Sequence, residues 1–169
     1  DSAPMTDAQV LAAVGSSLPH AEGLFAPDTY VFDAGSSDLD ILRQAFRAQQ
    51  ARLARAWEQR SDGLPLKSPY EALILASIVE KETGKPEERR MVAGLYSNRV
   101  RTGMKLQADP TIIYPVTKGK PLGRRIRQSE LRRDTDYNTY LKPGLPKGPI
   151  ANPGRDSIMA VLDPAETDA

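Results

Sequence analysis

The sequence predicts an α+β fold in which a helical core at about residues 38–102 precedes a loop-rich half with short, irregular strands. Apolar residues recur at helical spacing through the first of these regions. After Gly103 the chain becomes rich in Pro, Gly, Asn and Tyr, so regular elements there must be short. We expect residues 1–36 to form a segment that leads into a main domain at residues 37–169.

The first element expected is a short helix within residues 6–17. Thr6 is a plausible N-cap, and Gln9, three residues later, completes the signature of a capping box. Farther on, residues 29–33 are a strand candidate bounded by Pro, Gly and Asp. The chain opens without an initiator Met or a long apolar segment and ends without a clear terminator, so we expect it to be a piece of a longer protein.

The clearest helix is expected at about residues 38–60, where apolar residues repeat every three or four positions from Leu42 onward. Gly63 supplies a stop signal after this helix. Two shorter helices are expected at about residues 86–102 and 155–162, and the first of them has an apolar side and a charged side.

Between these helices, Ser68 is expected to cap another one, with Pro69 at its first position. This helix is apolar from residue 72 to residue 79 and then carries a carboxylate, a lysine and a second carboxylate at residues 80–82. Gly84 follows and ends it. Acids are disfavoured at a helix C-terminus by the helix dipole, so this pair of carboxylates calls for an explanation.

The two carboxylates cannot act as a helical pair. Consecutive residues in a helix are rotated by about 100°, so Glu80 and Glu82 point to different sides. Glu82 lies over the bulkier apolar patch, where desolvation raises the pKa of a carboxyl and favours the protonated form that a general acid needs. The simpler alternative is that the helix surfaces here and that both acids are solvated.

The composition is typical of a globular protein and narrows the chemistry. Of the 169 residues, 40% are hydrophobic and 27% are charged. The net charge of +1 gives no global field that would attract nucleic acid. There is no cysteine, and the single histidine, His20, leaves little material for a histidine-based triad or metal site. We therefore predict no metal centre and no cofactor.

Four stretches, in this order, resemble the endolytic murein transglycosylase family, also called the YceG-like family. They are EGLFAPDTYVF, LASIVEKETG, LQADPTIIY and YNTYLKPGLPKGPIANPG, and the resemblance covers about residues 20–168. It implies a lyase of the bacterial cell wall that cleaves the β-1,4 bond between N-acetylmuramic acid and N-acetylglucosamine in nascent glycan strands. The product carries a 1,6-anhydro ring, and the loop-rich half is expected to form a glycan groove.

The same resemblance implies segments that are not found in these 169 residues. They are an N-terminal membrane anchor, a small LysM-like domain and an aromatic, glycine-rich stretch after Asp168. We therefore expect residues 37–169 to be a C-terminally truncated catalytic domain of a protein anchored to the cytoplasmic membrane, with this domain on the periplasmic side of the cell envelope. Glycan strands of peptidoglycan are the expected partner, and peptidoglycan synthases are a further candidate.

The resemblance and the apolar surroundings select the same acid. In similar lytic transglycosylases the catalytic Glu precedes a Ser at the end of an apolar helix, and Glu82 followed by Thr83 is the similar pair here. We assign Glu82 as the acid/base and Glu80 as a supporting carboxylate. One acid can suffice, because the C6 hydroxyl of the sugar attacks C1 within the same molecule and no water nucleophile is required.

The candidates for substrate binding lie in the second half. Asp109 precedes a proline, which is typical of a helix N-cap, although a capping carboxylate can also shape a cleft. A turn at Asn152 is as compatible with the sequence as a substrate contact, and the YNTY stretch could anchor a loop instead of binding sugar. The full set is Gln107, Asp109, Thr111, Tyr137, Asn138, Thr139 and Asn152.

Two alternatives use the same residues or their neighbours. A non-catalytic glycan-binding or scaffold domain would need the same tyrosines and apolar cleft.

Residues 118–133 carry seven basic residues against one acid, but this run has no aromatic ring on which bases could stack. We therefore predict no nucleic-acid partner and expect a solvated loop there, which could also meet lipid head groups or peptide-stem carboxylates.

Overall fold

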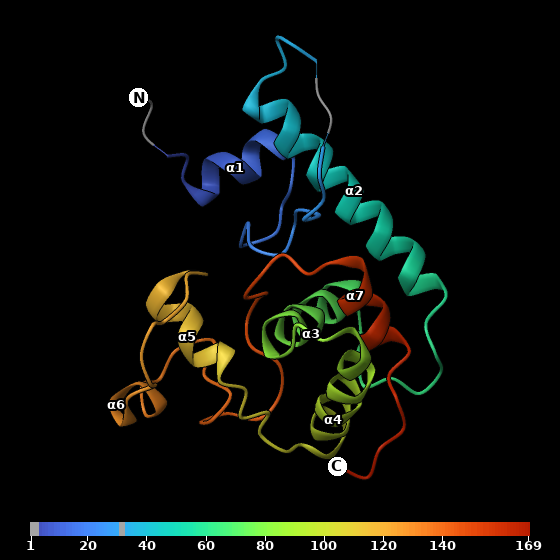
Figure 1. Ribbon diagram of the computed structural model, residues 1–169, viewed down its shortest axis with the longest axis vertical. Coiled ribbons are helices and arrows are strands. Elements are labelled where there is room, and N and C mark those ends of the chain that lie inside the picture. The colour runs from blue at the N-terminus through green and yellow to red at the C-terminus, as the bar shows by residue number, and fades with distance from the viewer. Residues whose placement is uncertain (1–3, 31–32) are drawn as a thin grey trace.

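The computed structural model describes residues 4–30 and 33–169 and shows a helical protein (Figure 1). Its elements are α1 (Asp7–Val14), α2 (Asp38–Glu58), α3 (Pro69–Glu82), the 3-10 turn η1 (Pro86–Glu88), α4 (Arg89–Thr102), α5 (Pro110–Thr117), α6 (Gln128–Leu131) and α7 (Arg155–Leu162). No β-strand occurs within the described ranges. The predicted α+β class is therefore wrong, and the fold is helical with long connections.

The strands expected at residues 29–33 and after residue 104 are replaced by irregular backbone and by short helices. Residues 29, 30 and 33 are irregular, and 31–32 lie outside the described ranges. Residues 110–117 are rich in β-branched side chains, but they form α5 because the chain starts a helical turn there. The carbonyl of Asp109 accepts the N–H groups of Ile112 (2.9 Å) and Ile113 (3.2 Å), and Pro110 has no N–H to leave unpaired.

The helices predicted in the first half are confirmed, and their N-terminal ends follow from local capping. Thr6 and Gln9 form the predicted capping box at α1. Ser68 accepts a hydrogen bond from the backbone of Glu71, and Pro69 occupies the first position of α3. The helix predicted near residues 86–102 begins as η1 and continues as α4.

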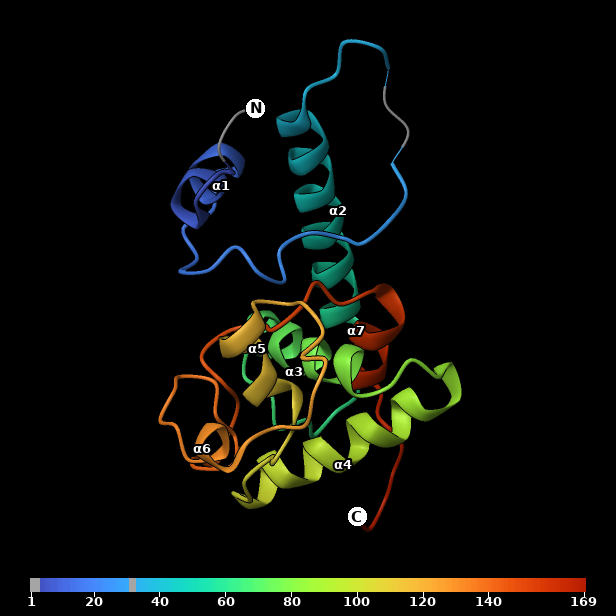
Figure 2. The ribbon, with the colours of Figure 1, turned by 60° about the vertical axis from the view of Figure 1, so that its left-hand side comes forward.

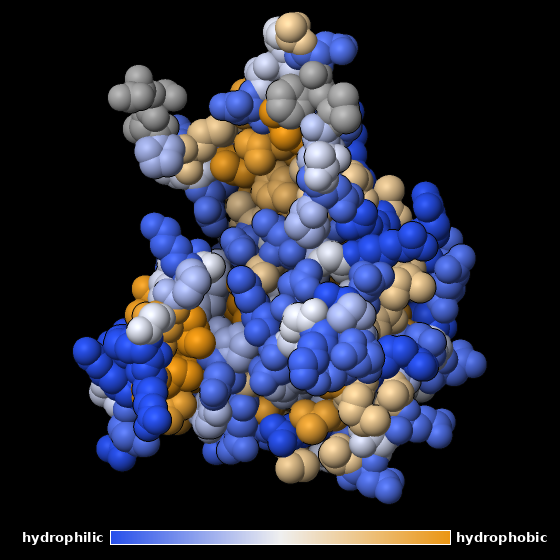
Figure 3. All heavy atoms as spheres, viewed as in Figure 1, coloured by the Kyte–Doolittle hydropathy of each residue, from blue (hydrophilic) through white to orange (hydrophobic). Residues whose placement is uncertain are grey.

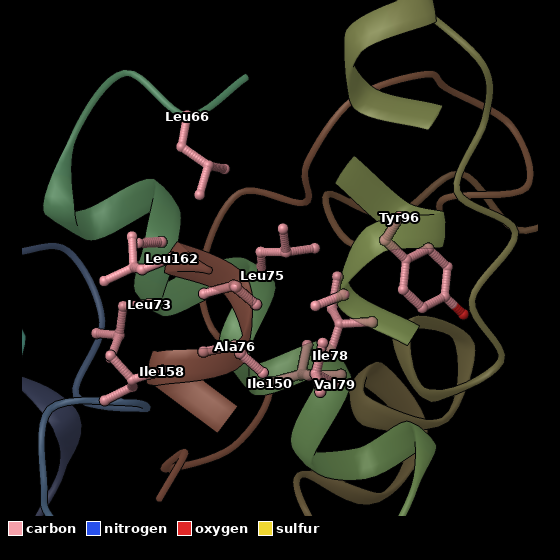
Figure 4. Packing of buried hydrophobic residues seen from close by; sticks show 14 of the residues in the cluster. Leu66, Leu73, Leu75, Ala76, Ile78, Val79, Tyr96, Ile150, Ile158 and Leu162 are labelled. Atoms are coloured by element: carbon pink, nitrogen blue, oxygen red, sulfur yellow. The ribbon is translucent and has the colours of Figure 1, made fainter. Parts of the chain in front are cut away.

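Helix α3 is the centre of the fold. All of its residues from Ala72 to Val79 are buried, and α2, α4, α5 and α7 contact it. Figures 1 and 2 show α3 enclosed by these helices, and Figure 4 shows Leu73 beside Ile158 and Leu162 of α7. Such a helix is apolar all round, so the first charged residues after Val79 mark the point where it reaches the surface.

The N-terminal part lies against one end of this core. Helix α1 packs on α2, and both extend away from α3 in Figure 2. Gln49 of α2 is 2% exposed, and its amide donates to the carbonyls of Gly23 (3.2 Å) and Pro153 (3.0 Å). Within the described residues, none of the helices has the length and apolar character that a bilayer span requires.

The basic run at residues 118–133 folds around one acid. Glu130 is 7% exposed and accepts hydrogen bonds from the Arg124 guanidinium (3.1 Å for Nη1) and from the backbone N–H of Arg127 (2.8 Å). Asn138 donates to the carbonyls of Leu131 (3.0 Å) and Arg133 (2.8 Å), which closes the end of the run. The expected loop is thus present, and hydrogen bonds to the buried side chains of Glu130 and Asn138 hold it in place.

Acid should loosen this loop before it affects the core. The Arg124 guanidinium lowers the pKa of Glu130 to about 2. A lowered carboxyl pKa contributes stability above the unfolded value, and this contribution is lost as the pH falls toward the folded value. We expect the protection of the Arg127 amide, measured as its exchange rate relative to the intrinsic rate at the same pH, to fall between about pH 4 and about pH 2, and Glu130→Gln should abolish this pH step. A protection factor at Arg127 that stays constant over this range in wild type would mean that the Glu130 contacts contribute nothing.

Candidate active site

The end of α3 sends three consecutive side chains to three different neighbours. Glu80 meets the start of α7, Lys81 lines a cavity with residues of α5, and Glu82 faces α4 and the residue before α5. This divergence follows from the 100° rotation per helical residue, as expected for the two carboxylates. Three residues that are adjacent in the sequence therefore have three different environments.

Glu80 has both carboxylate oxygens occupied by the protein. One accepts the backbone N–H of Gly154 (2.7 Å), and the other accepts the Ser157 hydroxyl (3.1 Å). Gly154 is the N-cap of α7, where the helix dipole favours an anion. Ser77, a possible partner of Glu80 from helical spacing, instead donates to the Ile74 carbonyl (2.6 Å). Glu80 therefore joins α3 to α7 and is not presented to a substrate.

Glu82 lies at an exposed position, but protein atoms crowd one side of its carboxyl. Partial burial raises the pKa of this carboxyl, and the neighbouring Asp109 carboxylate raises it further. The Tyr96 hydroxyl and the Arg99 guanidinium stabilise the anion and oppose this shift, but the net pKa remains above the ordinary value. The direction agrees with the one predicted from the apolar neighbourhood.

Asp109 occupies the N-cap position of α5, as expected, but its side chain does not cap the helix. Its carboxylate instead accepts a hydrogen bond from the Tyr140 hydroxyl. Burial and this hydrogen bond raise the pKa of Tyr140 to about 12, so its phenol stays protonated at neutral pH. The Asp109 carboxylate is thus held where its charge acts on Glu82.

The loop before α5 is constrained so that Asp109 reaches this place. Gln107 is exposed, and its backbone has a φ of 52°, a conformation that costs energy in a residue other than glycine. Its N–H donates to the carbonyl of Thr139 (3.1 Å). From α4, Arg99 donates to the carbonyl of Leu106 (2.5 Å). The strained residue is therefore fixed from both sides, two positions before Asp109.

Three of the predicted substrate-binding residues lie inside the protein. Thr111 and Thr139 are 0% and 2% exposed, and their hydroxyls bond to each other at 2.8 Å. Asn138 is also buried and accepts the backbone N–H of Tyr140 (2.8 Å). These side chains hold Asp109 and Tyr140 in place, and the structure does not bring them to a substrate.

Tyr137 and Asn152 make their contacts with other parts of the chain. The centre of the Tyr137 ring lies 5.0 Å from the centre of the Tyr114 ring. This packing favours the alternative in which the YNTY stretch anchors a loop. Asn152 accepts the backbone N–H groups of Gly23 (2.8 Å) and Phe25 (3.3 Å). It therefore ties the N-terminal segment to the loop before α7, a role that neither sequence interpretation anticipated.

The sequence does not single out Tyr96, Arg99 and Tyr140, which complete the site around Glu82 and Asp109. In helical periodicity Tyr96 belongs to an apolar face and Arg99 to a charged face, so neither stands out. Tyr140 is one of two tyrosines in the YNTY stretch, and the pattern does not distinguish them. Within the described residues, no group of three or more His, Cys, Asp or Glu side chains is arranged to hold a metal ion.

Comparison with known proteins identifies a family and several relatives that this chain resembles. The sequence profile described as the YceG-like family matches residues 3–169. The chain is 33% identical over 147 residues to an endolytic murein transglycosylase of Bacillus subtilis (strain 168). It is 31% identical over 153 residues to the protein of the same name in Streptococcus pneumoniae serotype 2 (strain D39 / NCTC 7466).

These alignments cover 87% of this chain but only 40% and 27% of the two relatives, so the chain spans less than half of their length. The crystal structure of a YceG-like protein from Listeria monocytogenes has a TM-score of 0.75 to this chain at 30% identity, and covers 95% of this chain and 54% of that one. Because the family profile extends over nearly all residues and the folds agree, the chain belongs to the YceG-like family.

Proposed function

We propose that this chain carries the catalytic part of an endolytic murein transglycosylase, a lyase that acts on peptidoglycan. The observation that carries the proposal is the Glu82 carboxyl, whose pKa is raised where Asp109, Tyr96 and Arg99 meet. The two relatives named above support the same activity. The bond cleaved would be the β-1,4 bond from N-acetylmuramic acid to N-acetylglucosamine, with a 1,6-anhydro end as product.

The geometry suits a cycle with a single acid. Protonated Glu82 donates its proton to the glycosidic oxygen, and the bond from that oxygen to C1 breaks. The C6 hydroxyl of the same sugar then attacks C1 and passes its proton to the Glu82 carboxylate, which restores the acid. No water is consumed, and the attack benefits from the high effective molarity of an intramolecular step.

Some neighbours of Glu82 stabilise its protonated form, and others stabilise its anion. Burial and the Asp109 charge favour the acid that starts the cycle, whereas Tyr96 and Arg99 stabilise the anion that forms when the proton leaves. Burial also raises the pKa of Tyr96 strongly, so its phenol remains a hydrogen-bond donor throughout. The Asp109 carboxylate can in addition stabilise the positive charge that develops at C1.

We further propose that the full-length protein works in the bacterial cell envelope. Its substrate would be assembled outside the cytoplasmic membrane, so a membrane anchor would hold the catalytic part on the periplasmic side, near peptidoglycan synthases. The support is the cell-wall polymer in the names of the relatives. Fractionation of cells that express the full-length protein, with protease added to spheroplasts, would test this placement.

The activity itself can be tested by the chemistry of its product. Peptidoglycan digested by this chain in H₂¹⁸O should release strands that end in anhydro-muramic acid without ¹⁸O, measured by mass spectrometry. Reducing ends that carry one ¹⁸O would show hydrolysis instead. Strands that bind tightly and are never cut would support the alternative of a glycan-binding domain.

The pH profile should report the pKa of Glu82. A general acid must be protonated, so the rate should fall as the pH rises through this pKa. Since the Asp109 charge raises the pKa, Asp109→Asn should move the falling limb to lower pH, as measured from initial rates between about pH 4 and about pH 8. Asp136→Asn, at an exposed acid paired with Lys147, is the matched control and should leave the limb in place. A limb that does not move in Asp109→Asn would mean that another group titrates.

A further inference from the structure

A cavity lies beside the candidate active site. It has a volume of about 180 Å³ and is lined by Lys81, Pro110, Ile113, Tyr114, Lys120 and Leu122, among others. Lys81 directly precedes Glu82, and Pro110 directly follows Asp109. Each acid of the site is therefore next in the sequence to a residue that lines the cavity. None of the proposed chemistry uses this cavity.

The lining combines an apolar floor with a basic rim. Ile150, 1% exposed, connects the floor to the core, and Ile113, Tyr114 and Leu122 supply the apolar walls. Figure 3 shows a hydrophobic band over α5 bordered by hydrophilic atoms on the side of α6. A hollow of this kind suits a group that is part hydrocarbon and part charged.

The charge at the rim of the cavity is positive. Lys81 and Lys120 line the cavity, and the Lys118 ammonium lies 5.4 Å from the centre of the Tyr114 ring. Among the residues that the structure describes, none of these three lysines has a carboxylate within 4.0 Å. Glu22 is the acid whose pKa responds to Lys81, and its own burial raises that pKa.

We propose that this cavity receives the peptide stem of the muramic acid next to the cleaved bond, with stem carboxylates at Lys81 and Lys120. This inference rests on the proposed function. The stem is attached to the same sugar whose C1 reacts, so it must lie close to Glu82 when the bond is cleaved. A carboxylate-bearing peptide supplies both the apolar and the anionic parts that the lining matches, whereas a neutral sugar would leave the two ammonium groups unused.

A pair of ligands that differ only in charge tests the assignment. One is the disaccharide of N-acetylglucosamine and N-acetylmuramic acid carrying L-alanyl-D-glutamate, and the other is its diamide. By calorimetry, the free acid should bind roughly three- to tenfold more tightly, since exposed ion pairs are individually weak. Methyl resonances of Ile113 and Leu122 should shift during the titration.

The variants separate this cavity from general electrostatics. Lys81→Gln/Lys120→Gln should abolish the preference for the free acid, whereas Lys67→Gln/Lys147→Gln removes the same charge elsewhere on the exposed surface and should preserve it. Equal affinity of the two ligands for wild type, or equal weakening of both by the first variant, would overturn the inference.

Two further outcomes keep the inference apart from its alternatives. If the first variant loses binding to phosphatidylglycerol vesicles and keeps its preference for the free acid, the rim serves a lipid surface and the inference is wrong. Formation of anhydro ends from peptide-free strands tests the proposed function alone. If that activity is present without a charge preference, only the stem site fails; if the preference is present without activity, the stem site stands in a binding domain.

Discussion

Glu82→Gln should lower the rate of anhydro-end formation by roughly 10²- to 10⁴-fold while the chain stays folded. The amide has the shape of the acid but cannot donate a proton to the glycosidic oxygen. The measurement is the rate of product formation by chromatography, combined with a thermal melt of the same preparation. Glu87→Gln, at an exposed acid that follows the same helix, is the control and should keep the wild-type rate.

The melt of Glu82→Gln carries its own prediction. Because the pKa of Glu82 is raised in the folded chain, the folded state holds this proton more firmly than the unfolded state does. Stability from this group is therefore present at low pH and lost as the pH rises through the folded pKa. At neutral pH the neutral amide should melt at the wild-type temperature or above it. Full turnover by Glu82→Gln, or its collapse to an unfolded chain, would contradict the assignment.

Glu80→Ala should act on stability instead, lowering the free energy of unfolding by about 2 kcal/mol. The substitution removes two hydrogen bonds, from the Gly154 N–H and the Ser157 hydroxyl, and takes an anion away from the start of α7. In a chain of this length the melting temperature should fall by about 5 °C. Urea unfolding of Glu80→Ala and wild type measures the difference directly.

Glu80→Gln is the graded comparison for this effect. The amide keeps one acceptor oxygen for the Gly154 N–H, so it should lose less stability than alanine does. If Glu80→Ala unfolds at the same urea concentration as wild type, the link between α3 and α7 is not made by this side chain.

The helices of the first half could be predicted because their signals are local. Thr6 with Gln9 starts α1, and Ser68 with Pro69 starts α3. Each signal satisfies its own backbone N–H groups within one turn, so no distant residue is required. The uninterrupted apolar run in α3 likewise predicts a helix that is buried on all sides.

The second half was beyond such local signals because its backbone is satisfied across long distances in the chain. The N–H of Gln107 bonds to Thr139, and the hydroxyls of Thr111 and Thr139 bond to each other. A turn that is closed by a residue about 30 positions away has no signature in its own sequence, so short strands were a reasonable but wrong expectation.

Some residues of the site could likewise be predicted from local sequence, and others could not. Glu82 and Asp109 could be selected because each stands in a distinctive local setting, one at the end of an apolar helix and one before a proline. Tyr96, Arg99 and Tyr140 join them only through the packing of α3, α4 and the loop before α7. Thr111, Thr139 and Asn138 have the polar groups of a binding site but use them to build its frame.

The most direct test compares Glu80→Gln and Glu82→Gln for one quantity, the rate of anhydro-end formation per folded molecule, at a temperature where both are native. Two carboxylates only two residues apart should give opposite results. Glu80→Gln should retain a rate close to wild type, and Glu82→Gln should lose nearly all of it. Loss of the rate in Glu80→Gln with retention in Glu82→Gln would contradict the account, because it would make the carboxylate bound to α7 the working acid.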